Sequence, residues 1–253
     1  MTFVSPFAYA QARLQARFGQ RPNAAVWERL HALGELPAWL EQARATALEE
    51  WVAAISATTP AHEIERLLRA RLRDTIEEVA RWVPSGWRAA VSWAGVVSGL
   101  PALAHLLRGE TAYAWMREEP LLRAVADVEP GLRARVLAQG PWAALAAPHP
   151  AAATLFEVWL AEWRRRHPGR SDRPAFDELT ALLQMHRTAF LRLPTGPGDD
   201  ARRALEARLE RLFHRAFLSP VAVFAWLLLA ALEFERVRCE LLTRALFPAP
   251  ETA

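Results

Sequence analysis

The clearest pattern of apolar and polar positions lies in the last long stretch, residues 219–247. It opens with Ser219 and Pro220, a typical helix start, because a serine hydroxyl caps free backbone N–H groups and proline pre-sets φ at the first helical position. Residues 221–232 are all apolar, so this half of the helix has no face suited to water. From Glu233 onward, charged and aliphatic residues share the helix until a proline ends it. We therefore predict a helix that is buried in its first half and half-exposed in its second, with the other helices packed around it.

A second long helix is predicted after Thr59, where a threonine–proline pair repeats the start signal, and it extends to about residue 83. Apolar side chains recur at steps of three and four at Ile64, Leu68, Leu72, Ile76 and Val79. Opposite charges spaced by four include Glu65 with Arg69 and Glu77 with Arg81. Such pairs stabilise an exposed helix face by roughly 0.2–0.5 kcal/mol each. We expect both pairs on the solvent side.

Shorter amphipathic segments fill the rest of the chain, and proline and glycine separate them. They predict helices over residues 6–18, 37–44, 47–56, 121–128, 151–167 and 176–193, a short helix capped by Asn23, a break at Pro101 and a helix opened by Asp199 and Asp200. Alanine and leucine dominate, and isoleucine occurs only three times, a choice that favours helices over strands. We predict a single all-α domain over residues 1–253, with a lobe boundary near residues 140–150.

The overall composition is that of an ordinary globular protein, with 52% apolar and 23% charged residues. Every basic residue is arginine, and the net charge of +3 is too small to require nucleic acid or an acidic membrane as partner. A single cysteine excludes an intrachain disulfide and suits a reducing compartment. No convincing signal peptide opens the chain. Residues 89–107 and 221–232 come nearest to a membrane span, and we interpret both as buried core helices.

Two acidic sequences resemble metal-binding motifs only in part. His62 and Glu63 open a helix, but Arg66 stands where a zinc motif of this kind needs its second histidine. Asp199 and Asp200 are followed by alanine and two arginines, whereas the aspartate-rich magnesium clusters of all-α prenyl-transfer enzymes need further carboxylates one turn on. Acidic residues at a helix start, where they face the positive end of the helix dipole, are the better interpretation of both.

The remaining reactive side chains also favour structural roles. Cys239 lies between aliphatic residues and is expected to be a packed thiol, and His105 and His186 are expected to be hydrogen-bonded core residues. A solvated loop is the favoured interpretation of the basic run after Trp163, and a surface for anionic partners is the alternative. That surface would comprise Arg164, Arg165, Arg166 and Arg170. No catalytic, cofactor-binding or metal-ligating set is predicted, which favours a binding or mechanical protein over an enzyme.

Several motifs nevertheless resemble the C/d family of V-type ATPase subunits. These motifs are carried by Tyr9, Arg13, Pro220, Glu233, Glu235, Arg238 and Arg244. In that family a proline-initiated apolar helix turns into an E-x-E segment, then an arginine and paired aliphatics, and the chain opens with a Tyr…Ala-Arg helix. This chain is shorter than usual family members, whose fold is three similar helical lobes arranged as a funnel. The resemblance implies a reduced lobe, which we expect between about residues 109 and 150.

The resemblance further implies a non-catalytic rotor component of a V/A-type rotary ATPase. Such a component lies peripherally on the cytoplasmic face, needs no cofactor and links the central-stalk subunits to the membrane rotor ring that carries protons or sodium ions. It transmits torque and breaks no bonds. The main alternative is a free-standing all-helical adaptor or regulatory protein that binds one helical partner. A third interpretation, an all-α enzyme, would require a polar pocket of convergent carboxylates or histidines.

Overall fold

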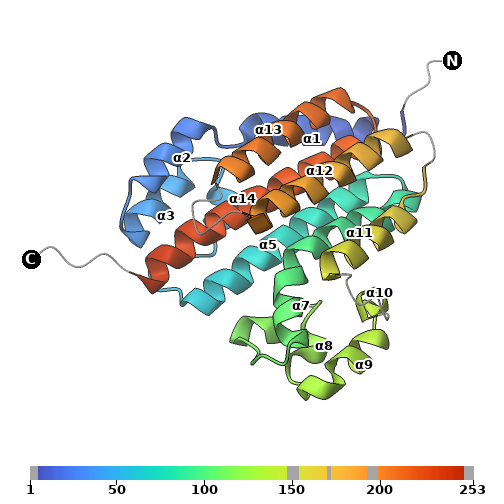
Figure 1. Cartoon of the computed structure of the whole chain (residues 1–253). Helices are drawn as coiled ribbons and strands as arrows, with labels where there is room; N and C mark the ends of the chain where they lie inside the picture. Colours follow the sequence, from blue (N-terminus) through green and yellow to red (C-terminus); the bar gives the residue numbers. More distant parts are fainter. Residues whose placement is uncertain (1–4, 147–153, 170–171, 193–198, 248–253) are drawn as a thin grey trace, which may run out of the picture. The chain divides into compact units, whose positions relative to one another are not determined.

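The protein is all-α. The computed structural model describes residues 5–146, 154–169, 172–192 and 199–247, and every regular element in these ranges is a helix (Figure 1). The fold class predicted from the sequence is therefore confirmed. By its internal contacts the chain divides into two compact units. The first unit comprises Met1–Phe18, Ile76–Val97 and Trp159–Leu232, and the second comprises Gly19–Thr75, Ser98–Val158 and Glu233–Ala253.

The first unit is built mainly from long helices. It contains α1 (Ala8–Gln20) up to Phe18, the end of α5 (Ala61–Trp82), η1 (Ser85–Trp87), α6 (Arg88–Ala94), the start of η2 (Gly95–Gly99), most of α11 (Leu155–Arg166), α12 (Arg173–Arg192), α13 (Asp199–Arg215) and the first half of α14 (Pro220–Leu246). The second unit holds the other half of α14, and α14 changes unit between Leu232 and Glu233. This is the position at which charged residues first enter the helix.

The first half of α14 is the core of the first unit. Ser219 accepts the backbone N–H of Val221 at 3.2 Å, as expected for a helix cap. All residues from 220 to 230 are buried, which confirms the burial predicted for most of the apolar run. Around Phe224 the contacts are aromatic, with Trp163 edge-on at 5.0 Å between ring centroids and Phe176 at 5.6 Å. A wholly apolar helix is stable here because every face meets another side chain.

The second unit is built from shorter helices around the other halves of α5 and α14. Its remaining elements are α2 (Ala24–His31), α3 (Leu36–Arg44), α4 (Glu49–Val52), α7 (Leu100–Leu107), η3 (Ala114–Arg117), α8 (Arg123–Ala126), η4 (Pro130–Leu132), α9 (Arg133–Ala138) and α10 (Ala143–Ala146). The helix starts follow the sequence signals. Asn23 accepts the N–H of Val26 at 3.0 Å, and Pro101 lies in the first turn of α7 with Gly99 as N-cap. The predicted apolar stripe of α5 is buried at all five positions.

Several predicted boundaries were wrong. The helix expected over residues 47–56 is reduced to the single turn α4, and that expected over residues 121–128 to α8. Within the expected bridge at residues 140–150, α10 forms one helical turn, and residues 147–150 lie outside the described ranges. The lobe boundary near this bridge stays a prediction.

One helical stretch in the described part of the chain, Ser85–Leu107, is long and apolar enough to cross a membrane by length and composition alone. It consists of η1, α6, η2 and α7 in succession, and more than half of its most apolar part is buried inside the protein. Core helices of this kind meet the same criterion. The absence of a membrane-spanning segment stays a prediction.

Candidate functional site

The charged half of α14, in the second unit, carries most of the residues that the sequence marks as a motif. Glu233 begins it. One carboxylate oxygen of Glu233 accepts the indole N–H of Trp51 at 2.7 Å, and the other lies 3.5 Å from Nε of Arg21. The next residue, Phe234, is fully buried, with its ring 6.2 Å from that of Trp51. Glu233 therefore anchors α14 to the early helices of this unit.

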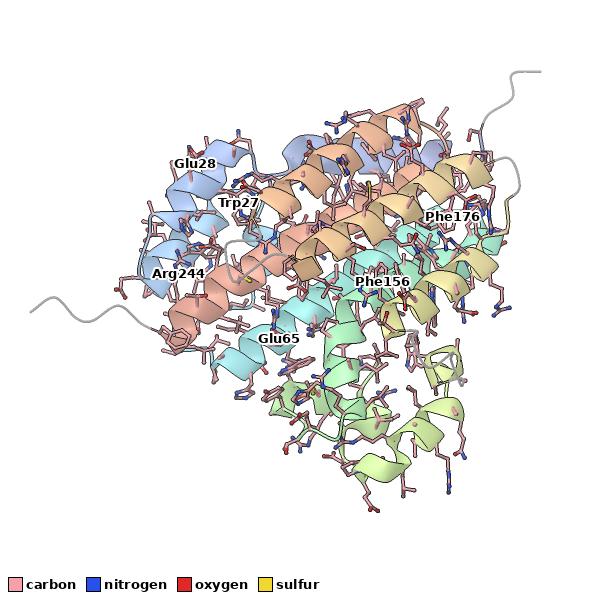
Figure 2. The ribbon with its side chains drawn as sticks, viewed as in Figure 1. Trp27, Glu28, Glu65, Phe156, Phe176 and Arg244 are labelled. Carbon is pink, nitrogen blue, oxygen red and sulfur yellow. The ribbon has the colours of Figure 1, made fainter. Side chains whose placement is uncertain are left out.

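One turn further along, Arg238 joins a buried ion cluster with α5. The cluster is centred on Glu65, which Figure 2 labels on α5 and whose side chain is 3% exposed. Its Oε1 accepts Nε–H of Arg69 at 2.7 Å, and its Oε2 accepts Nε–H of Arg238 at 2.6 Å. Arg69 also donates to the carbonyl of Ser98 at 3.2 Å and lies over the ring of Trp115 at 4.3 Å. Both oxygens of the buried carboxylate thus have a cationic donor.

The burial of this cluster corrects the sequence analysis, which placed Glu65 and Arg69 on the exposed side of α5. Spacing four apart predicts that two charges meet, but it does not say which side of the helix is covered. Arg238, 173 positions away in the chain, supplies the second cation that makes burial of Glu65 tolerable. A buried carboxylate with two cationic donors is far less costly than an unpaired one.

The pKa of Arg238 is raised. Burial by itself lowers it, but the carboxylates of Glu65 and Glu235 outweigh that effect. Glu235 lies 3.5 Å from the guanidinium of Arg238. The arginine therefore stays charged throughout the physiological range and offers no proton for acid–base chemistry. Its role is to hold α14 against α5.

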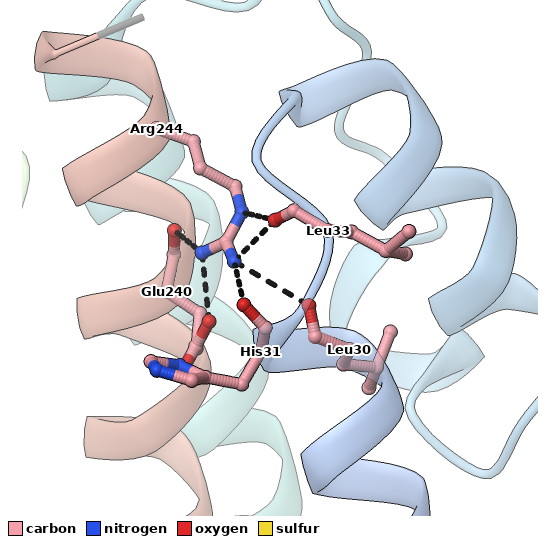
Figure 3. Close-up of polar contacts among 5 residues, drawn as sticks. All are labelled: Leu30, His31, Leu33, Glu240 and Arg244. Carbon is pink, nitrogen blue, oxygen red and sulfur yellow. Dashed lines mark hydrogen bonds and ion pairs between the residues drawn. The ribbon is translucent and has the colours of Figure 1, made fainter. Parts of the chain in front are cut away.

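Near the end of the helix, Arg244 joins α14 to the end of α2 (Figure 3). Its Nε and Nη2 donate to the carbonyl of Leu33 at 2.8 and 2.6 Å, and Nη2 also lies 3.4 Å from the carbonyls of Leu30 and His31. Nη1 donates to the carboxylate of Glu240 at 2.7 Å. The last carbonyls of a helix lack partners within the helix. A planar, always-charged guanidinium satisfies several of them at once and complements the negative end of the helix dipole.

Other arginines act in the same way. Arg133 is buried and donates to the carbonyls of Leu106 and Glu110 at 2.6 and 2.8 Å, at the end of α7. In the first unit, Arg173 donates to the carbonyl of Arg164 at 3.1 Å, near the end of α11. Lysine lacks the forked donor geometry for such contacts. This geometry gives a physical reason for arginine at these positions.

The N-terminal motif residues lie in the other unit. Arg13 donates to the hydroxyl of Tyr9 at 2.6 Å and lies over the ring of Trp82 at 4.8 Å. Tyr9 is 58% exposed. The contacts of these two residues are thus local to the first unit, whereas Glu233, Glu235, Arg238 and Arg244 share the second. Pro220 begins α14 in the first unit, as predicted.

The arginines expected as an interaction surface form contacts within the first unit. Arg164 donates to the hydroxyl of Thr180 at 2.8 Å. Arg165 and Arg166 both bind the carboxylate of Glu162 at 2.6 Å, and Arg166 lies over the ring of Trp93 at 4.2 Å. The hydrogen bond from Arg165 is the main cause that lowers the pKa of Glu162. Arg165 remains 73% exposed, and Arg170 lies outside the described residues. A role in binding stays a prediction.

The weaker metal candidates do not form ligand sets. Glu63 forms an ion pair with Arg66, whose hydrogen bond is the main cause that lowers the carboxylate pKa, and His62 is exposed beside it. Asp200 pairs with Arg203, and the side chain of Asp199 lies outside the described part. Among the described residues, no group of three or more histidine, cysteine, aspartate or glutamate side chains is placed to hold a metal ion.

Three of the remaining predictions need correction. Cys239 is exposed rather than packed, because it lies on the side of α14 opposite the buried Val237 and Leu241. His105 donates to the carbonyl of Thr111 at 2.9 Å, so it is hydrogen-bonded, but it is half-exposed rather than a core residue. His186 is likewise only half-buried rather than a core residue, and burial is the main cause that lowers its pKa.

These contacts define an all-α protein whose marked charged residues serve helix packing. No protein-family model, curated protein or solved structure matches the chain. Paired and buried charged groups of this kind are suited to holding one helix against another.

Proposed function

We propose that this chain is a non-catalytic coupling component of a V/A-type rotary ATPase. In this role it links the central stalk to the membrane rotor ring and transmits torque for proton or sodium transport. It lies on the cytoplasmic face without a membrane span of its own and needs no cofactor. Its fold is a reduced version of a funnel of two or three similar helical lobes. The proposal extends the resemblance in Glu233, Glu235, Arg238 and Arg244 to the whole chain.

The observation that carries the proposal is the construction of α14. It is a continuous helix of 27 residues, fully buried along residues 220–230. Its second half is joined to α5 through Glu65 and to α2 through Arg244. A part that transmits torque has to resist deformation, and close-packed interiors with paired charges do so. The family-like residues are the ones that form these joints, which supports a mechanical reason for their presence.

Co-purification tests the proposal. The full chain carrying an affinity tag is expressed in the organism from which it comes and is recovered from gently solubilised membranes. We expect stalk and rotor-ring proteins of a rotary ATPase in stoichiometric amounts, and release of the chain from membranes by an alkaline wash that spares integral proteins. Recovery of one unrelated helical partner, with neither stalk nor ring, would instead support the adaptor alternative and overturn the proposal.

A matched pair of variants tests the expected arginine surface in the same experiment. Arg165 and Arg203 are 73% and 69% exposed, and each forms an ion pair with an acid three residues earlier. If the end of α11 contacts a partner, Arg165→Glu lowers recovery of the complex, and Arg203→Glu on α13 does not. Equal recovery with both variants removes the arginine surface from the proposal and leaves the coupling function standing.

A further inference from the structure

His167 directly follows α11 in the first unit and is only 6% exposed. Three aromatic rings surround its imidazole. Trp87 of η1 meets it edge-on at 4.8 Å between ring centroids, Phe176 of α12 lies at 4.3 Å, and Phe224 of α14 lies at 6.3 Å. Phe176 is labelled near the start of α12 in Figure 2. A titratable ring thus lies inside an apolar cluster, at the point where α11 meets α12.

The hydrogen bonding of His167 decides which tautomer its neutral ring adopts. Its Nδ1 lies 3.0 Å from the carbonyl oxygen of Gly169, and because a carbonyl only accepts, Nδ1 carries the hydrogen. Nε2 is then the bare nitrogen of a neutral imidazole. This Nε2 is buried and has no hydrogen-bond partner in the described part of the chain. Protonation would place an N–H and a positive charge at an atom that has no acceptor, which is costly in an apolar surrounding.

The charged groups around the cluster do not offset this cost. Burial is the main cause that lowers the pKa of His167, although the bond to Gly169 opposes it. From the start of α12, Arg173 lowers the pKa further, and Asp172 and Asp177 each raise it by less than Arg173 lowers it. Neither η1 nor the first half of α14 contains a charged residue. α11 itself contributes Arg164, Arg165 and Arg166, whose guanidiniums bind Thr180 and Glu162.

We propose that His167 is a pH-sensitive latch, which holds the end of α11 to the start of α12 at neutral pH and releases it when the imidazole is protonated. On release the charged ring moves into water, and Trp87 and Phe176 lose the side chain that covers them. The direction of this pH effect follows from the number of protons that each state binds. The open state, with an ordinary pKa near 6.5, binds more protons than the closed state, so the latch is strongest above that pH and weakens as the pH falls. This inference does not depend on the proposed function.

Hydrogen exchange of the full chain, corrected for intrinsic exchange rates, tests the latch at pH 7.5 and 5.5. In the wild type we expect amides of residues 162–169 and 173–180 to lose protection at the lower pH, by up to about tenfold per pH unit below 6.5. His167→Phe fills similar space and does not titrate, so its protection is expected to be independent of pH in this range. His186→Phe is the control, because His186 is a half-buried imidazole further along α12, and its pKa is also lowered. It is expected to retain the wild-type response.

The proposal is overturned if the wild type keeps its protection at pH 5.5, if His167→Phe opens as the wild type does, or if His186→Phe abolishes the response. Should His167→Phe fail to fold, an NMR titration of the His167 ring in the wild-type chain decides the question. A pKa below 6.5 together with acid-induced opening supports the latch, and a pKa at or above 6.5 overturns it.

Discussion

Trp93 and Trp159 each donate an indole N–H to the other's backbone carbonyl, at 2.9 Å in both directions. Both side chains are almost completely buried in the first unit, where they join α6 to α11. Trp163 adds a third such bond, from its indole to the carbonyl of Ala90 at 3.0 Å. Tryptophan here supplies both a large apolar surface and a donor for a buried carbonyl.

We predict that Trp93→Phe destabilises the protein by about 1–3 kcal/mol more than the same change at Trp226. The substitution at Trp93 removes the indole hydrogen bond to the buried carbonyl of Trp159, which is costly in an apolar interior. Trp226 is also buried in the first unit, but its indole N–H has no partner among the described residues, so Trp226→Phe removes packing volume and no hydrogen bond. Urea denaturation of both variants measures the two free energies of unfolding. Equal losses would show that the reciprocal bonds add nothing beyond aromatic packing.

Replacement of Glu65 by glutamine is expected to be strongly destabilising, by about 3–5 kcal/mol, because it leaves the buried Arg69 without its carboxylate and Arg238 with only Glu235 at 3.5 Å. Glu77 lies on the same helix α5 but is exposed. Glu77→Gln is therefore expected to change the free energy of unfolding by less than about 0.5 kcal/mol. Chemical denaturation at neutral pH compares the pair. If Glu65→Gln proves as mild as Glu77→Gln, the ion cluster does not stabilise this unit.

A third prediction concerns the contact between Arg244 and the end of α2. Arg244→Lys keeps the charge but loses the forked donors that reach Leu33, Leu30 and Glu240. We expect a loss of about 1–3 kcal/mol in stability, with faster hydrogen exchange in α2. Arg29 is exposed on α2 itself, and Arg29→Lys is the matched control. Faster exchange in α2 with the control variant as well would show that this helix frays for another reason.

The fourth prediction is a pH dependence. The pKa of Glu162 is lowered from 4.5, mainly by the hydrogen bond from Arg165 and also by Arg166. Because the unfolded chain binds this proton more readily, the carboxylate stabilises the folded state fully above pH 4.5 and loses this effect as the pH falls below it. The difference in unfolding free energy between wild type and Glu162→Gln should therefore be largest at neutral pH and shrink in acid. A difference that stays constant down to about pH 3 contradicts this assignment.

Much of the fold follows from local signals that act within a few residues. The serine–proline and threonine–proline pairs at Ser219 and Thr59 correctly predict where α14 and α5 begin, and Asn23 caps α2 as expected. The apolar run after Pro220 predicts burial on all sides. The lengths of the short helices do not follow from such local signals. In α4 and α8 a single turn is held by packing, so propensity over a longer window overestimates their length.

The candidate site was predictable only in part. The sequence marks Glu233, Arg238 and Arg244 as a pattern, but it does not contain their partners. Glu65 lies 173 positions from Arg238, and Leu33 lies 211 positions from Arg244. His167 carried no local signal at all, because its surroundings come from η1, α12 and α14.

The sequence by itself determined an all-α protein, the extent of its two longest helices and the burial of the first half of α14. It could do so because helix periodicity, capping and apolar content act locally. Only the tertiary structure decided that Glu65 and Arg69 are buried, that Cys239 is exposed and that the imidazole of His167 lies among aromatic rings. Those outcomes depend on which distant side chains cover a given face, and no spacing along the chain encodes that.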